Sequence, residues 1–417
     1  FEEGADEFHG TGGPLNVSKL RHTSVLSETF VNSASFAGYK QLTDFNRDDR
    51  EGIGFYHVTQ ANGQRCSTAK GYLTQAKHRN NLTVLTKVAA EKVLLKEGRA
   101  IGVQVREKGA VSRYFAKSEV ILCGGAINSP QLLMLSGVGP RNELEDKGIF
   151  VHQDLPGVGQ NLQDHLDAIV QYTCKAREGY AVALGALPSY VKATADYAFK
   201  RNGIFSSNIA EAGGFVSSSL ASQGPDIQFH FLPAILNDHG RQLAFGYGYG
   251  LHVCCLYPKS RGTISLQSNH PADQALIDPN YLSAAEDQQV MIEGVRIARK
   301  LLSAPDFDRF QGSELYPGEE AQTDDEILEF LRERAETIYH PIGTCKMGSD
   351  DDEMAVVDNQ LRVRGVAGLR VVDASVMPSL IGGNTNAPTV MIAERAAKFI
   401  KAAHEGQPVS IGNAESA

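Results

Sequence analysis

The sequence predicts a mixed α/β fold (α+β overall) in which one domain contains strand-to-helix units and the other contains an antiparallel sheet. At 417 residues the chain is long enough for two or three domains of about 150 residues each. An apolar strand at 119–123 runs directly into small residues and then into a helix at 129–135, which is typical of α/β domains. Between 166 and 338, β-like and helical segments are mixed, which favours a separate domain built on an antiparallel sheet.

Apolar periodicity and turn residues place the elements of the first part of the chain. We expect a helix over 24–38, with Ser24 or Ser27 as its cap, and a short helix that ends near Ala76. The spacing then predicts strands at 82–85, 89–95 and 100–105, the last two joined by a tight glycine turn. In the helix at 129–135, Ser129 is the candidate cap and Pro130 the first helical residue.

The later part of the chain reads in the same way. Strands are predicted at 169–174, 227–232, 251–257, 262–267 and 369–372, and helices at 287–303, 324–336 and 390–403. The tail from His404 contains Gly and Ser and is expected to be loose.

Composition argues against several classes of function. The net charge of −9 makes an extended nucleic-acid surface unexpected, and no apolar run approaches the roughly 18 residues of a membrane span. The six cysteines form no C-x-x-C pair and no cluster at zinc-binding spacing, so we expect reduced thiols and no metal. Trp is absent, which removes the usual centre of an aromatic cage for quaternary ammonium groups.

The strongest candidate for chemistry lies in the stretch from Tyr339 to Thr389. His340 sits among Pro and Gly residues, where the chain must turn, and an imidazole can take or give a proton near neutral pH. Asn384 follows a Gly-Gly pair and offers a hydrogen-bonding amide. The alternative for His340 alone is that it merely satisfies backbone groups in a turn.

Two further sites carry open alternatives. The small residues after the strand at 119–123 place free N–H groups where a phosphate or a flavin edge could bind, or they form a plain strand-to-helix connection. Glu211 is embedded among small apolar residues. It is either buried, with a partner, a proton or a cationic or hydroxyl-bearing ligand, or it lies in a surface loop.

Residues 125–139 resemble, at every defined position, the second signature of the glucose–methanol–choline (GMC) flavoprotein oxidoreductases. The chain is also similar to that family at 62–69, 155–165, 260–262, 339–348 and 373–389, so the resemblance spans nearly the whole sequence. It is greatest for bacterial choline dehydrogenases and for primary-alcohol dehydrogenases. This resemblance implies FAD as cofactor and an incomplete Rossmann-like FAD-binding domain beside the antiparallel-sheet substrate domain.

The resemblance also implies roles for individual residues. His340 corresponds to the catalytic base of the family, and Asn384 to its second catalytic residue. Choline as substrate would need a cationic site, and Glu211 with Tyr339 could supply part of one. The positions matching FAD-binding segments are Ala90, Gly124, Ala126, Asp373, Ala374, Asn386 and Thr389.

One departure from the family concerns the start of the chain. Family members begin with a Rossmann unit whose G-x-G-x-x-G loop holds the FAD pyrophosphate, and that motif is missing here. We therefore expect this sequence to be the later part of a longer enzyme, with an N-terminal segment of the same protein as a partner. The expected domains are a lid or substrate-facing segment at 1–60, the FAD-binding domain at 61–165 and 345–403, the substrate domain at 166–344, and a tail at 404–417.

The resemblance implies that the protein oxidises a primary alcohol to an aldehyde, by hydride transfer to flavin N5 with His340 as base. The partners would be a small alcohol and an electron acceptor, either a quinone or O₂. The alternatives are choline oxidation, a lyase that keeps FAD for structure, and a non-catalytic fragment. The expected location is the cytoplasm, with peripheral attachment to the inner membrane left open.

Overall fold

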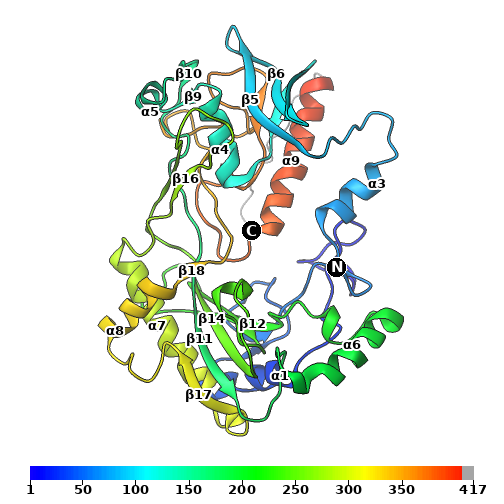
Figure 1. Cartoon of the computed structure of the whole chain (residues 1–417), viewed down its shortest axis with the longest axis vertical. Helices are drawn as coiled ribbons and strands as arrows, with labels where there is room; N and C mark the ends of the chain where they lie inside the picture. The colour runs from blue at the N-terminus through cyan, green and yellow to red at the C-terminus, as the bar shows by residue number, and fades with distance from the viewer. Residues whose placement is uncertain (406–417) are drawn as a thin grey trace. The chain divides into compact units, whose positions relative to one another are not determined.

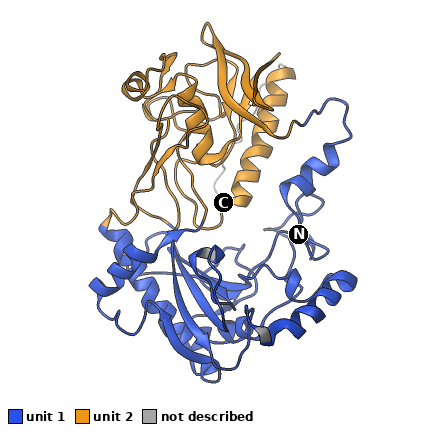
Figure 2. Cartoon of the chain, in the orientation of Figure 1, with its two compact units in different colours: residues 1–84, 166–256, 285–338 blue, residues 85–165, 257–284, 339–417 orange. Residues whose placement is uncertain are grey.

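A computed structural model describes residues 1–405, which form two compact units (Figure 2). Unit 1 comprises residues 1–84, 166–256 and 285–338, and unit 2 comprises 85–165, 257–284 and the chain from 339 onward. The boundaries drawn from the sequence differ from these units. Unit 1 contains 61–84, which was assigned to the FAD-binding domain, and unit 2 contains 257–284 and 339–344, which were assigned to the substrate domain. Within residues 1–405, no helix is both long and apolar enough to span a membrane. Most of the expected tail at 404–417 lies outside the described residues.

Unit 1 is organised around an eight-stranded, mainly antiparallel sheet of order β1-β2-β12-β13-β14-β11-β17, with β18 also paired to β11 (Figure 1). Its strands are β1 Gln41–Leu42, β2 Gly52–Phe55, β3 Gln60–Ala61, β4 Gln64–Arg65, β11 Leu166–Cys174, β12 Ala212–Val216, β13 Ile227–Leu232, β14 Gly248–Cys255, β17 Gln311–Tyr316 and β18 Glu336–Thr337. Its helices are α1 Val25–Asn32, α2 Ala34–Ala37, a π-helical turn at Ala69–Leu73, α3 Thr74–Ala76, α6 Leu187–Lys200, α7 Ala285–Leu302 and α8 Asp324–Arg334, with 3₁₀ turns at Leu184–Ala186, Ile204–Ser206, Asp238–Gly240 and Pro305–Phe307.

One face of this sheet is apolar and lies under helices. Phe231 of β13 stacks on Phe30 of α1 with ring centroids 4.7 Å apart, and Tyr249 of β14 stacks on Phe307 at 4.9 Å. Helix α7 crosses so close to β14 that a Cβ on Gly294 would stand 2.4 Å from a methyl carbon of Val253. Burial of these rings holds α1 and the turn at Pro305–Phe307 against the sheet, and close packing at Gly294 does the same for α7.

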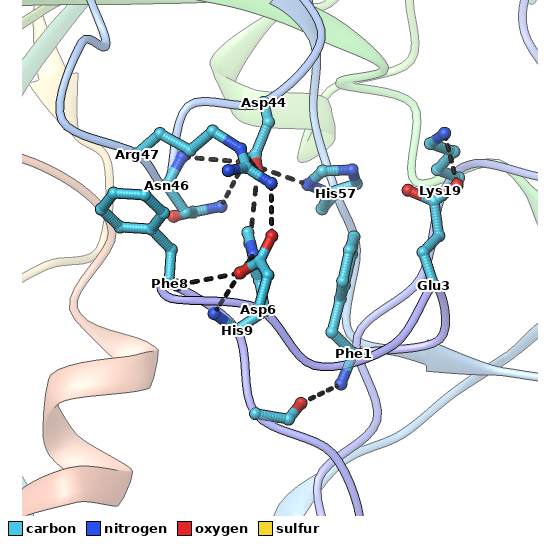
Figure 3. Close-up of polar contacts among 11 residues, drawn as sticks. Phe1, Glu3, Asp6, Phe8, His9, Lys19, Asp44, Asn46, Arg47 and His57 are labelled. Atoms are coloured by element: carbon cyan, nitrogen blue, oxygen red, sulfur yellow. Dashed lines mark hydrogen bonds and ion pairs between the residues drawn. The ribbon is translucent and has the colours of Figure 1, made fainter.

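The first residues of unit 1 are held by a polar cluster (Figure 3). Asp6 accepts hydrogen bonds from the backbone N–H of His9 and from its ring, at 2.8 and 2.9 Å. Asp44 accepts from Arg47 at 3.0 Å and lies 3.6 Å from Nδ1 of His57. Burial lowers the pKa of His57, although the charge of Asp44 opposes this. Arg47 also donates to Asp6, so the cluster ties residues 6–9 to the loop before β2.

Unit 2 combines a β-meander with short parallel pairs and two long helices. Its strands are β5 Val88–Lys96, β6 Arg99–Glu107, β7 Ala110–Phe115, β8 Val120–Leu122, β9 Val138–Gly139, β10 Gln153–Asp154, β15 Thr263–Ser265, β16 Leu276–Asp278 and β19 Leu369–Val371. Its helices are α4 Gly125–Leu135, α5 Arg141–Asp146, α9 Asn386–Glu405 and a 3₁₀ turn at Ala374–Val376. Strands β5, β6 and β7 form the antiparallel meander, and β8 pairs in parallel with β19.

Several sequence-based boundaries were wrong. The structure assigns no strand to 82–85, and the helix expected over 24–38 is divided into α1 and α2. Ser24 does cap α1, because its hydroxyl accepts the N–H of Leu26. Helix α4 begins four residues before the expected cap, so Ser129 and Pro130 lie inside it.

Glu211 is buried in unit 1, which rules out the surface-loop alternative. One carboxylate oxygen accepts the backbone N–H of Ser24 and the hydroxyl of Ser27, each at 2.7 Å. The other accepts the hydroxyls of Ser207, at 2.6 Å, and of Tyr180. Burial and the charge of Glu211 raise the pKa of Tyr180, so this phenol stays protonated as a donor. The carboxylate therefore joins the start of α1 to the segment before β12.

We expect Glu211→Ala to lower the free energy of unfolding by roughly 3 kcal/mol or more, because it leaves several buried donors without an acceptor. Chemical denaturation measures this, with the exposed Glu178→Ala as the matched control. Unchanged stability together with a raised KM for substrate would instead place Glu211 at a substrate contact.

Candidate active site

The candidate site in unit 2 is built where two loops pair as short antiparallel strands. Gln163 and Ile342 exchange both backbone hydrogen bonds, at 3.1 and 2.9 Å. This register places residue 165 opposite residue 340. Gly343 is required beside the pair, since its φ is +94° and a Cβ there would stand 2.4 Å from the carbonyl oxygen of Asn161.

The structure brings His340 and Asn384 together, as their expected roles require. Nδ2 of Asn384 lies 3.2 Å from Nε2 of His340. The backbone N–H of His340 donates to one oxygen of Asp164 at 2.9 Å, and Tyr281 donates its hydroxyl to the other at 2.5 Å. His340 is half-buried and Asn384 exposed, so the pair is accessible to a small molecule.

His165 also belongs to this site, although no role was predicted for it. It is fully buried, its Nδ1 lies 2.9 Å from Nδ1 of His340, and the two rings are nearly perpendicular at 87°. Its Nε2 lies 3.2 Å from the carbonyl oxygen of Ile381. The contact joins positions 175 residues apart. Only the pairing of the two loops reveals it.

Tyr339 precedes His340 and has an unusual backbone conformation. Its φ is +66°, a region that aromatic residues rarely adopt, and its side chain is 56% exposed. Such strain concentrates at functional sites. Glu211, the other expected substrate residue, lies in unit 1.

Asp373 is a structural centre of the second expected region. One of its oxygens accepts the backbone N–H of Gly125 at 2.9 Å and the hydroxyl of Ser129 at 2.6 Å. The other accepts the backbone N–H and the hydroxyl of Ser375, at 2.8 and 2.5 Å. The carboxylate thus joins the end of β19 to the start of α4. Ser129 contributes its hydroxyl from within that helix.

The remaining FAD-binding candidates of unit 2 fall in different places. The carbonyl of Ala126 accepts the hydroxyl of Thr344 at 2.6 Å, and that of Ala374 accepts the N–H of Gly343 at 3.4 Å, so both adjoin the His340 loop. Asn386 and Thr389 lie in the first turn of α9, just after Asn384. Ala90 lies in β5 of the meander and is exposed. Gly124 is exposed at the end of β8.

A flavin nucleotide fits the chemistry of this unit. Parallel strands β8 and β19 both end at the corner where α4 begins, and ligands bind outside the carboxyl ends of such strands. Small residues leave room there: Gly124 is exposed, and a Cβ on Gly125 would meet no atom within 4 Å. Helix α9 directs its N-terminus, the positive end of its dipole, to the segment of Asn384.

Two cysteines near this corner are poor nucleophiles. Burial and the charge of Asp373 raise the pKa of the Cys123 thiol to about 11 and raise that of Cys345 as well. Both thiols are therefore protonated at neutral pH. Among the residues that the structure describes, no group of three or more His, Cys, Asp or Glu side chains is arranged to hold a metal ion.

The chain is similar to known proteins along most of its length. Residues 2–167 and 258–393 match the N-terminal and C-terminal models of the GMC oxidoreductases. The chain is 49% identical to an alcohol dehydrogenase [acceptor] of Pseudomonas putida, over 94% of this chain and 71% of that protein. It is 41% identical to an oxygen-dependent choline dehydrogenase of Vibrio vulnificus, over 95% and 71%.

Solved structures agree as well. A formate oxidase of Aspergillus oryzae, studied for the modification of its FAD, superimposes with a TM-score of 0.86 at 26% identity, over 95% of this chain and 74% of that one. Together with the matches to both family models, these relatives show that the chain belongs to the GMC oxidoreductase family.

Proposed function

We propose that the protein binds FAD and oxidises an uncharged primary alcohol to an aldehyde, with His340 as the proton acceptor. The observation that carries the proposal is the contact between Nε2 of His340 and the amide of Asn384, 3.2 Å apart on an accessible surface of unit 2. A substrate hydroxyl bound between them would give its proton to the imidazole and accept a hydrogen bond from the amide. Such a pair favours a developing alkoxide.

We further propose which residues hold the cofactor. Gly124, Ala126 and Asp373 with Ala374 would line its place at the ends of β8 and β19, with Asn386 and Thr389 at the start of α9 and Ala90 at its adenine end. When bound, FAD supplies the hydride acceptor at flavin N5. The partners would be the alcohol and an electron acceptor, either a quinone or O₂.

The contacts of Glu211 favour an uncharged alcohol over choline. A quaternary ammonium group would need an available anion or an aromatic cage. Both carboxylate oxygens of Glu211 already accept hydrogen bonds from the chain's own donors, and Trp is absent. The names of the relatives include both an alcohol dehydrogenase, at 49% identity, and choline dehydrogenases, at 41–42%.

We expect His340→Ala to lower the rate of flavin reduction by about 10²-fold or more, because the hydroxyl proton loses its acceptor. Anaerobic stopped-flow mixing of the flavin-loaded protein with alcohol measures this rate. His270→Ala, which changes a largely exposed histidine, is the control. Near-normal bleaching of the flavin in His340→Ala would contradict the assignment.

A competition assay tests the substrate class. With choline and a medium-chain primary alcohol present together, we expect the alcohol to be consumed with the higher kcat/KM, because the Glu211 carboxylate is fully buried among the chain's own donors and is not available to a quaternary ammonium group. Exclusive turnover of choline would overturn this preference while leaving the role of His340 intact.

A further inference from the structure

We propose that His165 is a positioning residue, which holds the proton of neutral His340 on Nδ1 and so leaves Nε2 as the site that accepts a proton. The evidence is a chain of three polar contacts within unit 2. The carbonyl oxygen of Ile381 lies 3.2 Å from Nε2 of His165, Nδ1 of His165 lies 2.9 Å from Nδ1 of His340, and Nε2 of His340 lies 3.2 Å from Nδ2 of Asn384.

The positions of the protons follow from the first of these contacts, the one with the carbonyl oxygen of Ile381. A carbonyl oxygen only accepts hydrogen bonds, so Nε2 of His165 must carry a hydrogen. A neutral imidazole has one N–H, which leaves Nδ1 of His165 with a lone pair. Two ring nitrogens 2.9 Å apart need a hydrogen between them, and here it comes from Nδ1 of His340.

The other end of these contacts agrees with the same tautomer. Nδ2 of Asn384 faces Nε2 of His340, and an amide nitrogen only donates, so Nε2 offers a lone pair in this arrangement. Because an amide can turn over and present its oxygen instead, this contact follows the tautomer and does not fix it. The competing arrangement, in which a cationic His165 donates from both nitrogens, would place a charge on a side chain with 0% exposure. Burial of that kind disfavours the charged form.

The surroundings keep His165 in this orientation. Its neighbour Gln163 accepts the N–H of Leu380 at 3.1 Å and donates to the carbonyl of Pro378 at 3.1 Å, which places the carbonyl of Ile381. Asp164 holds the backbone N–H of His340 at 2.9 Å. Gln163 thus holds the segment that contains the Ile381 carbonyl, Asp164 holds the backbone of His340, and His165 contacts the His340 ring.

The tautomer is measurable without turnover. In flavin-loaded protein labelled with ¹⁵N-histidine, long-range ¹H–¹⁵N spectra distinguish a protonated ring nitrogen from one with a lone pair, and His340→Gln identifies the signals. We expect a protonated Nδ1 and a lone pair on Nε2 of His340. In His165→Leu, which removes the acceptor, we expect the proton to move to Nε2.

His165→Asn is the conservative partner variant, because its side-chain oxygen can accept near the position of Nδ1. We expect it to keep the Nδ1–H tautomer and to reduce flavin within a few-fold of the normal rate, whereas His165→Leu should be slower by about 10²-fold or more with little change in KM. A purely structural role would not produce this division between the two variants.

The effect of His165 on the rate of flavin reduction rests on the proposed function, whereas the tautomer of His340 does not. The results therefore distinguish the two. A wild-type His340 protonated on Nε2, or a tautomer unchanged in His165→Leu, would overturn the role of His165. Should His165→Leu fail to fold, the wild-type and Asn spectra still decide. Normal flavin reduction in His340→Ala would reject the proposed base and leave the tautomer assignment standing.

Discussion

Two backbone hydrogen bonds between Gln163 and Ile342 determine most of the candidate site. They set the register that brings His165 opposite His340, because side chains two residues from a paired position lie on the same face. Gln163 then uses its side chain to hold the segment at 378–380, and that segment leads to Asn384. Groups from three distant parts of the chain therefore meet through one short pairing.

Two carboxylates were expected near bound molecules, Glu211 near the substrate and Asp373 near FAD. Both accept hydrogen bonds from other parts of the chain. Glu211 accepts hydrogen bonds from Ser24, Ser27, Tyr180 and Ser207. Asp373 accepts them from Gly125, Ser129 and Ser375. Each oxygen accepts two hydrogen bonds, which supplies the donors that a buried carboxylate needs. In the proposed site, the groups that would face an alcohol are an imidazole and an amide.

The sequence predicted local features well and long-range ones less well. Alternation and a glycine turn located β5 and β6, and apolar runs located β8, β13 and α7, because these patterns depend on neighbouring residues. Ser129 was misjudged as a cap because its partner, Asp373, is 244 residues away. The strand expected at 82–85 has β-like residues, but the described structure provides it with no partner strand.

The residues of the candidate site also divide into those that local motifs predicted and those that only long-range contacts reveal. His340 and Asn384 were predicted from motifs that resemble a family, whereas His165 was not, since nothing in the spacing of a Gly-rich loop indicates which ring it will face. The burial of Glu211 also had to wait for the structure, because small apolar neighbours occur both in cores and in surface loops.

The backbone around Tyr339 limits how this region can vary in length. Residues 166 and 337 are paired, as are 163 and 342, so two residues on one segment face four on the other. The two extra residues are accommodated at Ile338 and Tyr339, and the φ of Tyr339 is +66°. Because side chains alternate between faces along a strand, losing or gaining one residue here would turn the His340 ring away from His165. Among natural relatives and engineered libraries, substitutions should therefore be tolerated in this stretch far more readily than insertions or deletions.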